Sequence, residues 1–231
     1  MTARRELLLR TLRAPSLRRY ALRRRLMLLA LSLIARPGAP GERVEHLGSD
    51  YGGWTVPVER LRPGWSCWCG GSGVEVSFEL ELDGRFGCEV HCVDPTDEAS
   101  AHVAATGLQF HQFALWSSDG AIELWEALDP THQTLSADDL QGSGRPVTVP
   151  ARSLSTLTGG TTPDLVKLDI EGGEYEVIPT LPGRPEVLLF ELHPTRGVRA
   201  ALALVRALQR DGYRVVARRG ADLTFVRAAT V

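Results

Sequence analysis

The chain has 231 residues, of which 43% are apolar and 23% are charged. This length suits one α/β domain or two small ones, and the composition excludes a wholly disordered protein. No apolar run reaches the roughly 18 residues that a membrane-spanning helix needs. We therefore expect a folded protein without a transmembrane helix.

The net charge of −2 conceals an uneven distribution of charge along the chain. Residues 1–36 carry ten arginines and one acidic residue, a net of +9, and the remaining chain carries a net of −11. Because the body of the protein is acidic, we expect no nucleic-acid partner.

The basic N-terminal block predicts a helical extension. Ser16 is a suitable N-cap for a helix that reaches about Ala35. Arginines followed by the apolar stretch 26–35 imitate a signal peptide, but a small-x-small cleavage site is missing. We expect a helix packed on the domain or on a partner, with peripheral membrane contact through residues 1–36 as the alternative. The predicted location is cytoplasmic, at most peripheral to the membrane.

The chain then divides into a helical extension with its linker, residues 1–41, and one main domain, residues 42–231. From residue 50 strands and helices alternate, with strands predicted over 65–69, 89–93 and 108–113. A helix is expected over 99–106. The segment 74–82 alternates like a strand, but we expect a helix there because a glycine-rich turn after a strand usually opens one.

Asp119-Gly120 predicts a turn between paired strands at 113–116 and 122–125, and the polar stretch 127–146 predicts a loop over one end of the sheet. The later elements are strands and helices in alternation, followed by a terminal strand pair: strands 147–149, 165–170, 186–192, 213–217 and 223–226, and helices near 152–158 and 198–209. This order predicts an α/β fold with a mostly parallel, doubly wound sheet and an antiparallel C-terminal edge hairpin.

A glycine-rich turn follows the first strand of the main domain. Gly71 and Gly73 allow the backbone to come close to a ligand, and Ser72 lies between them. Asp94 follows 21 residues after Gly73, at the end of the next strand, where a carboxylate binds the ribose hydroxyls of an adenosine cofactor. A dinucleotide site usually has a third glycine and positive charge near the pyrophosphate. The third glycine is missing here, and no basic residue lies between 70 and 84. We therefore expect S-adenosylmethionine as the cofactor.

A second group of polar residues comes from the ends of two later strands. Asp169 and Glu171 end one buried strand, and His193 follows the next. Buried carboxylates at strand ends are costly unless they are used or paired, and a histidine could take a proton from a hydroxyl at neutral pH. Glu174 fits the start of a helix better than a catalytic role. The cysteine spacings Cys67-x-Cys69 and Cys88-x3-Cys92 resemble a zinc site only imperfectly, and we expect no metal.

Together these residues resemble the FkbM-type branch of the S-adenosylmethionine-dependent methyltransferases. The resemblance spans roughly residues 48–228 and includes a Y-G-G-W-x-V-P segment at 51–57. Its most specific part is the string K-x-D-I-E-G-x-E-Y at 167–175. It implies a Rossmann-like sheet of seven strands and methyl transfer to a hydroxyl oxygen of a natural product or a sugar.

By position, the resemblance implies that Gly71, Gly73 and Asp94 hold the cofactor and that Asp169, Glu171 and His193 line the transfer site. Asp169 is also a candidate for the cofactor's amino group, and Glu171 or His193 is the candidate base. The alternatives are a catalytically silent S-adenosylmethionine-binding module, a nicotinamide-dependent oxidoreductase, and a metal-assisted methyltransferase that uses Asp169 and Glu171 as ligands.

Overall fold

The computed structural model describes residues 15–38, 41–127, 134–139 and 142–228. The start of the predicted N-terminal extension and residues 128–133 and 140–141 of the predicted loop lie outside this part of the chain.

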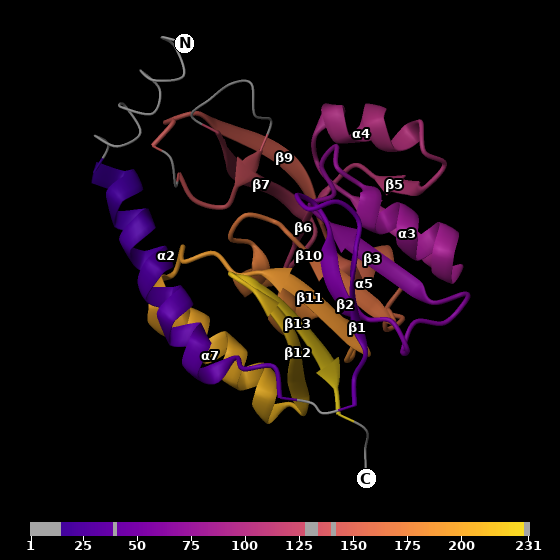
Figure 1. Ribbon diagram of the computed structural model, residues 1–231. Helices are drawn as coiled ribbons and strands as arrows, with labels where there is room; N and C mark the ends of the chain where they lie inside the picture. Colours follow the sequence, from indigo (N-terminus) through magenta and orange to yellow (C-terminus); the bar gives the residue numbers. More distant parts are fainter. Residues whose placement is uncertain (1–14, 39–40, 128–133, 140–141, 229–231) are drawn as a thin grey trace, which may run out of the picture.

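A mixed sheet of seven strands forms the centre of the molecule (Figure 1). The strand order is β12-β13-β11-β10-β3-β4-β5, and neighbouring strands from β11 to β5 are parallel. β13 is antiparallel to both of its neighbours, so the predicted C-terminal edge hairpin is confirmed. The strands are β3 (Ser66–Gly70), β4 (Glu89–Val93), β5 (Gln109–His111), β10 (Leu165–Leu168), β11 (Val187–Glu191), β12 (Tyr213–Arg219) and β13 (Asp222–Arg227).

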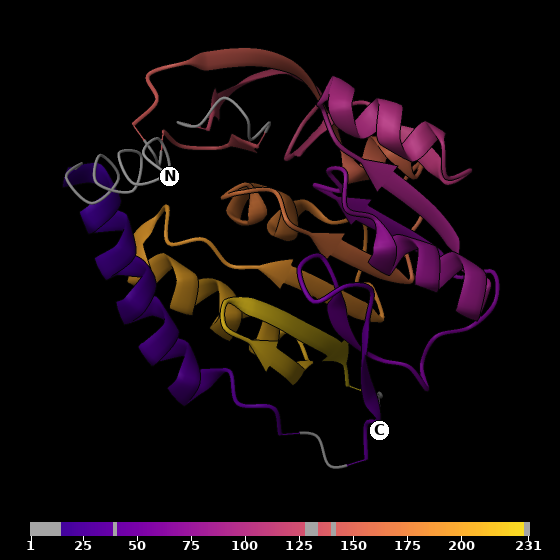
Figure 2. The same cartoon turned by 45° about the horizontal axis from the view of Figure 1, so that its top comes forward.

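Helices cover both faces of this sheet (Figures 1 and 2). One hydrophobic core joins the sheet to α2 (Pro15–Ile34), α5 (Leu154–Leu157), α6 (Glu174–Val177) with the short 3-10 helix η1 (Ile178–Thr180), and α7 (Gly197–Arg210). The other core joins it to α3 (Ser77–Phe86), α4 (Asp97–Ala104) and the hairpin of β1 (Val44–Leu47) and β2 (Trp54–Pro57). The continuous apolar runs of β10 and β11 are buried because both faces of the sheet are covered.

The crossovers reverse direction at β3, which lies between β4 and β10. From β3 the chain proceeds outward through β4 and β5, and it later returns on the other side through β10 and β11. Ligands bind outside the carboxyl ends of the strands at such a switch point. The fold therefore places the glycine turn after β3 and the acidic residues after β10 at one edge.

A second, four-stranded sheet has the order β6-β9-β7-β8. It corrects the predicted strand pair around Asp119-Gly120. β6 (Ala114–Trp116) and β7 (Gly120–Glu126) do not pair with each other, because β9 (Pro146–Ser153) lies between them, parallel to β6 and antiparallel to β7. β9 is longer than the predicted strand 147–149, and β8 (Leu135–Ser136) adds a short strand inside the predicted loop. Pairing with a strand from later in the chain cannot be detected from a local turn signal.

The helix after the glycine turn is confirmed, although it begins at Ser77 rather than at Val74. Residues 71–76 instead form a longer turn, and Val74 and Glu75 in this turn line the cavity described below. The alternating apolar residues of 74–82, which resemble a strand, therefore lie partly in a turn and partly in the helix α3.

The N-terminal helix α2 packs along α7 (Figure 1). Met27 and Leu31 on the inner face of α2, and Ala35 directly after the helix, are fully buried in the main core. This confirms the expectation of a helix packed on the domain. Within the described residues, no helix has both the length and the apolarity needed to cross a bilayer.

The packing of α2 gives a first prediction. Replacing Leu31 with alanine should lower the free energy of unfolding by about 2–5 kcal/mol, because a fully buried leucine leaves a cavity when it is truncated. Leu29, on the same helix but 60% exposed, is the matched control, and Leu29→Ala should change stability by less than about 0.5 kcal/mol. Equal effects in urea titrations of the full chain would contradict the docking of α2.

Candidate active site

A cavity of about 420 Å³ opens at the carboxyl ends of β3, β4, β10 and β11. The glycine turn and Asp94 form one side of it, and Asp169, Glu171 and Glu191 form another. The small sheet and the residue before β6 supply an apolar wall that includes Phe113, Ala114, Leu115, Trp116, Ile122, Leu124 and Leu135. The structure thus brings the predicted cofactor turn and the predicted strand-end acids to one cavity.

The glycine turn needs its glycines for two different reasons. Gly71 has φ +68, and a Cβ atom on it would lie 1.8 Å from the carbonyl oxygen of Asp169, so only glycine lets the two strand ends come together. Gly73 has φ +57 but faces open space, so its requirement is conformational. Ser72 lines the cavity, yet its hydroxyl donates to the Cys69 carbonyl at 2.9 Å and is occupied by the turn itself.

Asp94 holds the turn in shape from the end of β4. One of its carboxylate oxygens accepts the backbone N–H of Gly73 at 3.1 Å. The other accepts both the N–H and the hydroxyl of Thr96, at 2.9 and 2.6 Å. Asp94 is 7% exposed and faces the cavity, so its carboxylate is oriented toward the space where a ligand would lie.

Lys167 anchors the same turn from inside the core. Its ammonium donates to the carbonyl of Gly71 at 3.2 Å and lies 3.5 Å from Glu79 of α3, in a pair whose side chains are 4% and 1% exposed. Burial would lower the pKa of Lys167, but the charges of Glu79 and Asp169 raise it above its usual value. The lysine of the K-x-D-I-E-G string is therefore a charged residue of β10 that contacts both α3 and the cofactor turn.

Glu171 occupies a strained position at the edge of the cavity. Its φ is +48, and among the described residues it is the only non-glycine residue with a positive φ. Strain of this kind persists where the surrounding structure imposes it, most often at functional sites. Burial would raise the pKa of Glu171, but its hydrogen bond to His193 holds that pKa below the usual value.

His193 lies behind Glu171 and does not line the cavity. Its Nε2 is 3.0 Å from Glu171, and its Nδ1 is 3.0 Å from Glu174, which is fully buried in the first turn of α6. Both ring nitrogens therefore donate, as in an imidazolium ion. Burial would lower the pKa of His193, but the two carboxylates raise it well above its ordinary value. This favours a positioning role over that of a base.

Glu191 is a cavity residue that the sequence reasoning missed as a candidate. It ends β11, lines the cavity, and lies 3.8 Å from Nε2 of His193. Burial raises its pKa to about 7, and the charges of Asp169 and Asp222 add to the shift against the charge of His193. A signal was present, since Glu191 and His193 are two residues apart and extended chain places such residues on one side.

The N-terminal helix also reaches this cluster. Arg24 of α2 lies 3.6 Å from Glu191. Burial raises the pKa of Tyr20, one helical turn earlier, and the charges of His193 and Glu171 act on its hydroxyl in opposite directions. The basic block therefore contributes to the edge of the site as well as to the core.

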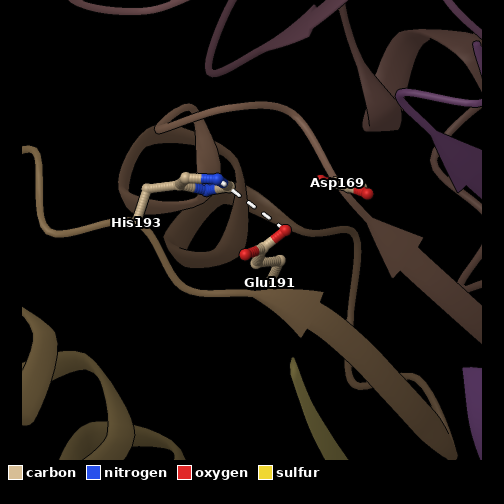
Figure 3. A group of neighbouring side chains, drawn as sticks. All are labelled: Asp169, Glu191 and His193. Atoms are coloured by element: carbon tan, nitrogen blue, oxygen red, sulfur yellow. Dashed lines mark ion pairs between the residues drawn. The ribbon is translucent and has the colours of Figure 1, made fainter. Parts of the chain in front are cut away.

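Asp169, Glu191 and His193 are close enough to one another to hold a metal ion (Figure 3). One ligand atom from each lies within 4.8 Å of the others. However, both ring nitrogens of His193 already donate to Glu171 and Glu174, so the imidazolium itself supplies the positive charge in this cluster. The four cysteines are buried, and none of them belongs to this group.

A histidine pair lies apart from the cavity. His91 of β4 and His111 of β5 have ring nitrogens 3.1 Å apart, and Trp68 stacks on His91 with a ring separation of 4.1 Å. Burial lowers the pKa of both imidazoles. Sequence spacing did not suggest this pair, because it depends on the register between parallel strands.

The fold and the cavity define an α/β protein with a nucleoside-cofactor site at a topological switch point. Residues 64–215 match the family model of the methyltransferase FkbM domain, and the chain belongs to this family. No curated protein sequence matches the chain. Among solved structures, it is similar to precorrin-6y C5,15-methyltransferase from Geobacter metallireducens GS-15, with 13% identity and a TM-score of 0.41 over 74% of this chain and 85% of that one.

The protein is thus a methyltransferase with S-adenosylmethionine as its cofactor. Membership of this family decides against the alternative of a nicotinamide-dependent oxidoreductase. The residues at the cavity fit this group. One carboxylate oxygen of Glu75 is buried without a hydrogen-bond partner, and this residue lines the cavity. Among the described residues, the lining contains one cationic side chain, Lys167, which the Gly71 carbonyl and Glu79 already engage. An acidic lining suits a ligand that carries an ammonium and a sulfonium.

The orientation of Asp94 gives a second prediction. Asp94→Ala should weaken binding of S-adenosylmethionine by roughly 1.5–3 kcal/mol, the scale of a hydrogen bond to a charged group. Glu89, exposed at the opposite end of the same strand, is the matched control, and Glu89→Ala should leave the affinity unchanged. Calorimetric titration measures both, and equal affinities in the parent and a folded Asp94→Ala would refute the assignment.

The buried ion pair gives a third prediction. Lys167→Met should destabilise the protein by about 3–5 kcal/mol, because it leaves the Glu79 carboxylate buried without its counter-charge. Adding Glu79→Leu should recover part of this loss in denaturant titrations. Affinity for S-adenosylmethionine should remain reduced in the double variant, because the Gly71 carbonyl still lacks its donor. Full recovery of both properties would show that the lysine does not anchor the turn.

Proposed function

We propose that the protein methylates a hydroxyl oxygen of a small molecule, a natural product or a sugar. The observation that carries this proposal is the set of three carboxylates, Asp169, Glu171 and Glu191, in the same cavity as the cofactor turn. A hydroxyl acceptor needs hydrogen-bond acceptors to orient it and a base to take its proton. Carboxylates provide both.

The apolar wall of the cavity suits the body of such an acceptor. Phe113 and Trp116 contribute aromatic surface, and Leu115, Ile122 and Leu124 contribute aliphatic surface. Apolar pockets with a few convergent polar groups are typical of small-molecule sites. The small sheet therefore supplies contact area, while the strand-end acids select the hydroxyl.

S-adenosylmethionine supplies an electrophilic methyl group when it is bound. The chain's own contribution is first to hold the acceptor oxygen in line with that group, since positioning can supply a large part of the barrier reduction. For the cofactor, we assign Gly71, Gly73 and Asp94 to the nucleoside, and Glu75 and Asp169 to the amino group. Asp169 lines the cavity with its pKa raised by burial.

Two carboxylates are candidates for the base. Glu171 is held by His193 and has a lowered pKa, which suits the orientation of the hydroxyl. Glu191 has a pKa of about 7, close to the value that a general base needs at neutral pH. We therefore assign proton removal to Glu191 and acceptor orientation to Glu171, with His193 as the positioning residue that fixes the Glu171 carboxylate.

This assignment gives a fourth prediction. In a screen of hydroxylated natural products and sugars with labelled cofactor, an active acceptor should gain one methyl group on oxygen. Turnover should rise with pH through about 7, because Glu191 is active only when deprotonated. Glu191→Gln should lower kcat by about 10²-fold and remove this pH dependence. Affinity for S-adenosylmethionine should stay within a few-fold.

The matched control is Glu123, which is exposed on β7 between two residues that face the cavity. Glu123→Gln should keep the parent kcat and pH profile. Glu171→Gln and His193→Gln should also lower kcat, but both should keep a pH dependence. In His193→Gln it should move to higher pH, because the imidazolium charge that lowers the pKa of Glu191 is removed. An unchanged Glu191→Gln would transfer the role of base to Glu171. Cofactor binding without transfer to any acceptor would favour a catalytically silent module.

A further inference from the structure

The helix α2 is apolar on two opposite faces. Its inner face is buried in the core, as described above, and its outer face carries four leucines: Leu22, Leu26, Leu29 and Leu33. Their spacing of four, three and four residues places them in one stripe. They are 60%, 49%, 60% and 67% exposed, which is unusual for one contiguous set of large apolar side chains. Packing on the domain does not explain this second face.

The charge around the stripe is uniformly positive. Arg19, Arg23 and Arg25 are exposed on α2, and no acidic residue occurs between residue 15 and residue 41. Arg24 points toward the site and pairs with Glu191, so it belongs to the inner side. The rest of the protein is acidic. The outer face of α2 is therefore a basic, leucine-rich surface on an otherwise acidic molecule.

We propose that this outer face docks on the surface of an anionic membrane. A bilayer with acidic lipids offers both complements, because its headgroups attract arginines and its interface accepts leucine side chains from a helix that lies in its plane. The helix is too polar to cross the membrane. Its docking would be peripheral, with α7 on the side away from the lipid.

A second copy of the chain fits this face less well. Two α2 helices paired through their leucines would bring two sets of arginines together, and α2 has no acidic side chain to offset them. Like charges in such a pairing are destabilising. The requirement for negative charge distinguishes the membrane from self-association.

Vesicle binding by the full-length protein tests the proposal. The protein should co-sediment with vesicles of phosphatidylcholine and phosphatidylserine, and it should bind vesicles of phosphatidylcholine alone at least about tenfold more weakly. Raising the ionic strength from about 0.1 M to about 1 M should weaken binding, because the Debye length falls from about 10 Å to about 3 Å. Equal binding to both vesicles, or none, would overturn the proposal.

Surface variants locate the contact. Replacing Leu22, Leu26, Leu29 and Leu33 together with glutamine should abolish vesicle binding while thermal unfolding and S-adenosylmethionine affinity stay at parent values. Arg19→Glu with Arg25→Glu should weaken binding at least about tenfold. Leu80 is 41% exposed on α3, away from α2, and Leu80→Gln should bind like the parent. If the leucine variant binds vesicles normally, the stripe is not the contact.

A fluorescent label measures insertion directly. The four native cysteines are buried, so Leu29→Cys provides a single accessible thiol for an environment-sensitive dye. Its emission should shift to the blue with anionic vesicles, whereas a label at Leu80→Cys should not respond. If the protein does not bind vesicles but forms a dimer in solution, and the leucine substitutions dissociate this dimer, the face contacts a second copy instead.

Discussion

The buried ammonium group of Lys167 is the constraint on which the site depends. It binds the Gly71 carbonyl, pairs with Glu79, and lies 5.8 Å from the centre of the Trp54 ring. A cation in this position must be compensated, because an unpaired charge in a core costs several kcal/mol. The strand β10, the helix α3 and the cofactor turn are therefore fixed relative to one another by a single charge, and Asp94 can meet the turn at hydrogen-bond distance.

A second charge, the His193 imidazolium, organises the acceptor edge in a similar way. It lies between Glu171 and Glu174, and Glu191 is the next carboxylate along. The hydrogen bond to His193 holds the pKa of Glu171 below its usual value, whereas burial raises the pKa of Glu191, which lies farther from the imidazolium. Two carboxylates on one cavity are thereby given different protonation behaviour, which is what a reaction with an oriented acceptor and a separate base requires. Arg24 connects this edge to α2, and so to the surface where we propose membrane contact.

Much of the fold could be predicted from local pattern, and the failures have a common cause. The apolar runs at 165–170 and 186–192, the amphipathic helix at 198–209 and the terminal hairpin all appear where they were expected, because each is determined by neighbouring residues. The pairing of β6 with β9 was not predictable, since its partners are far apart in sequence and the intervening turn signal favours a hairpin. The same limit applies to His91 and His111, which meet only through the register of two parallel strands.

The sequence by itself determined the family, the cofactor and the edge of the sheet at which the site lies. The strand–glycine turn–helix pattern and the acids after strands are local features. The carboxyl ends of parallel strands lie at one edge of the sheet, so these features must come together there. Only the tertiary structure decided which acids face the cavity and in what protonation state. An unperturbed histidine has a pKa that suits a base, yet the carboxylates of Glu171 and Glu174, from the segment after β10, hold His193 as a cation. Nothing in the sequence around Glu191 indicates an unusual carboxyl pKa, yet burial raises it to about 7. The pKa of a side chain depends on solvent exclusion and on charges brought close by folding, and neither can be deduced from its neighbours in the chain.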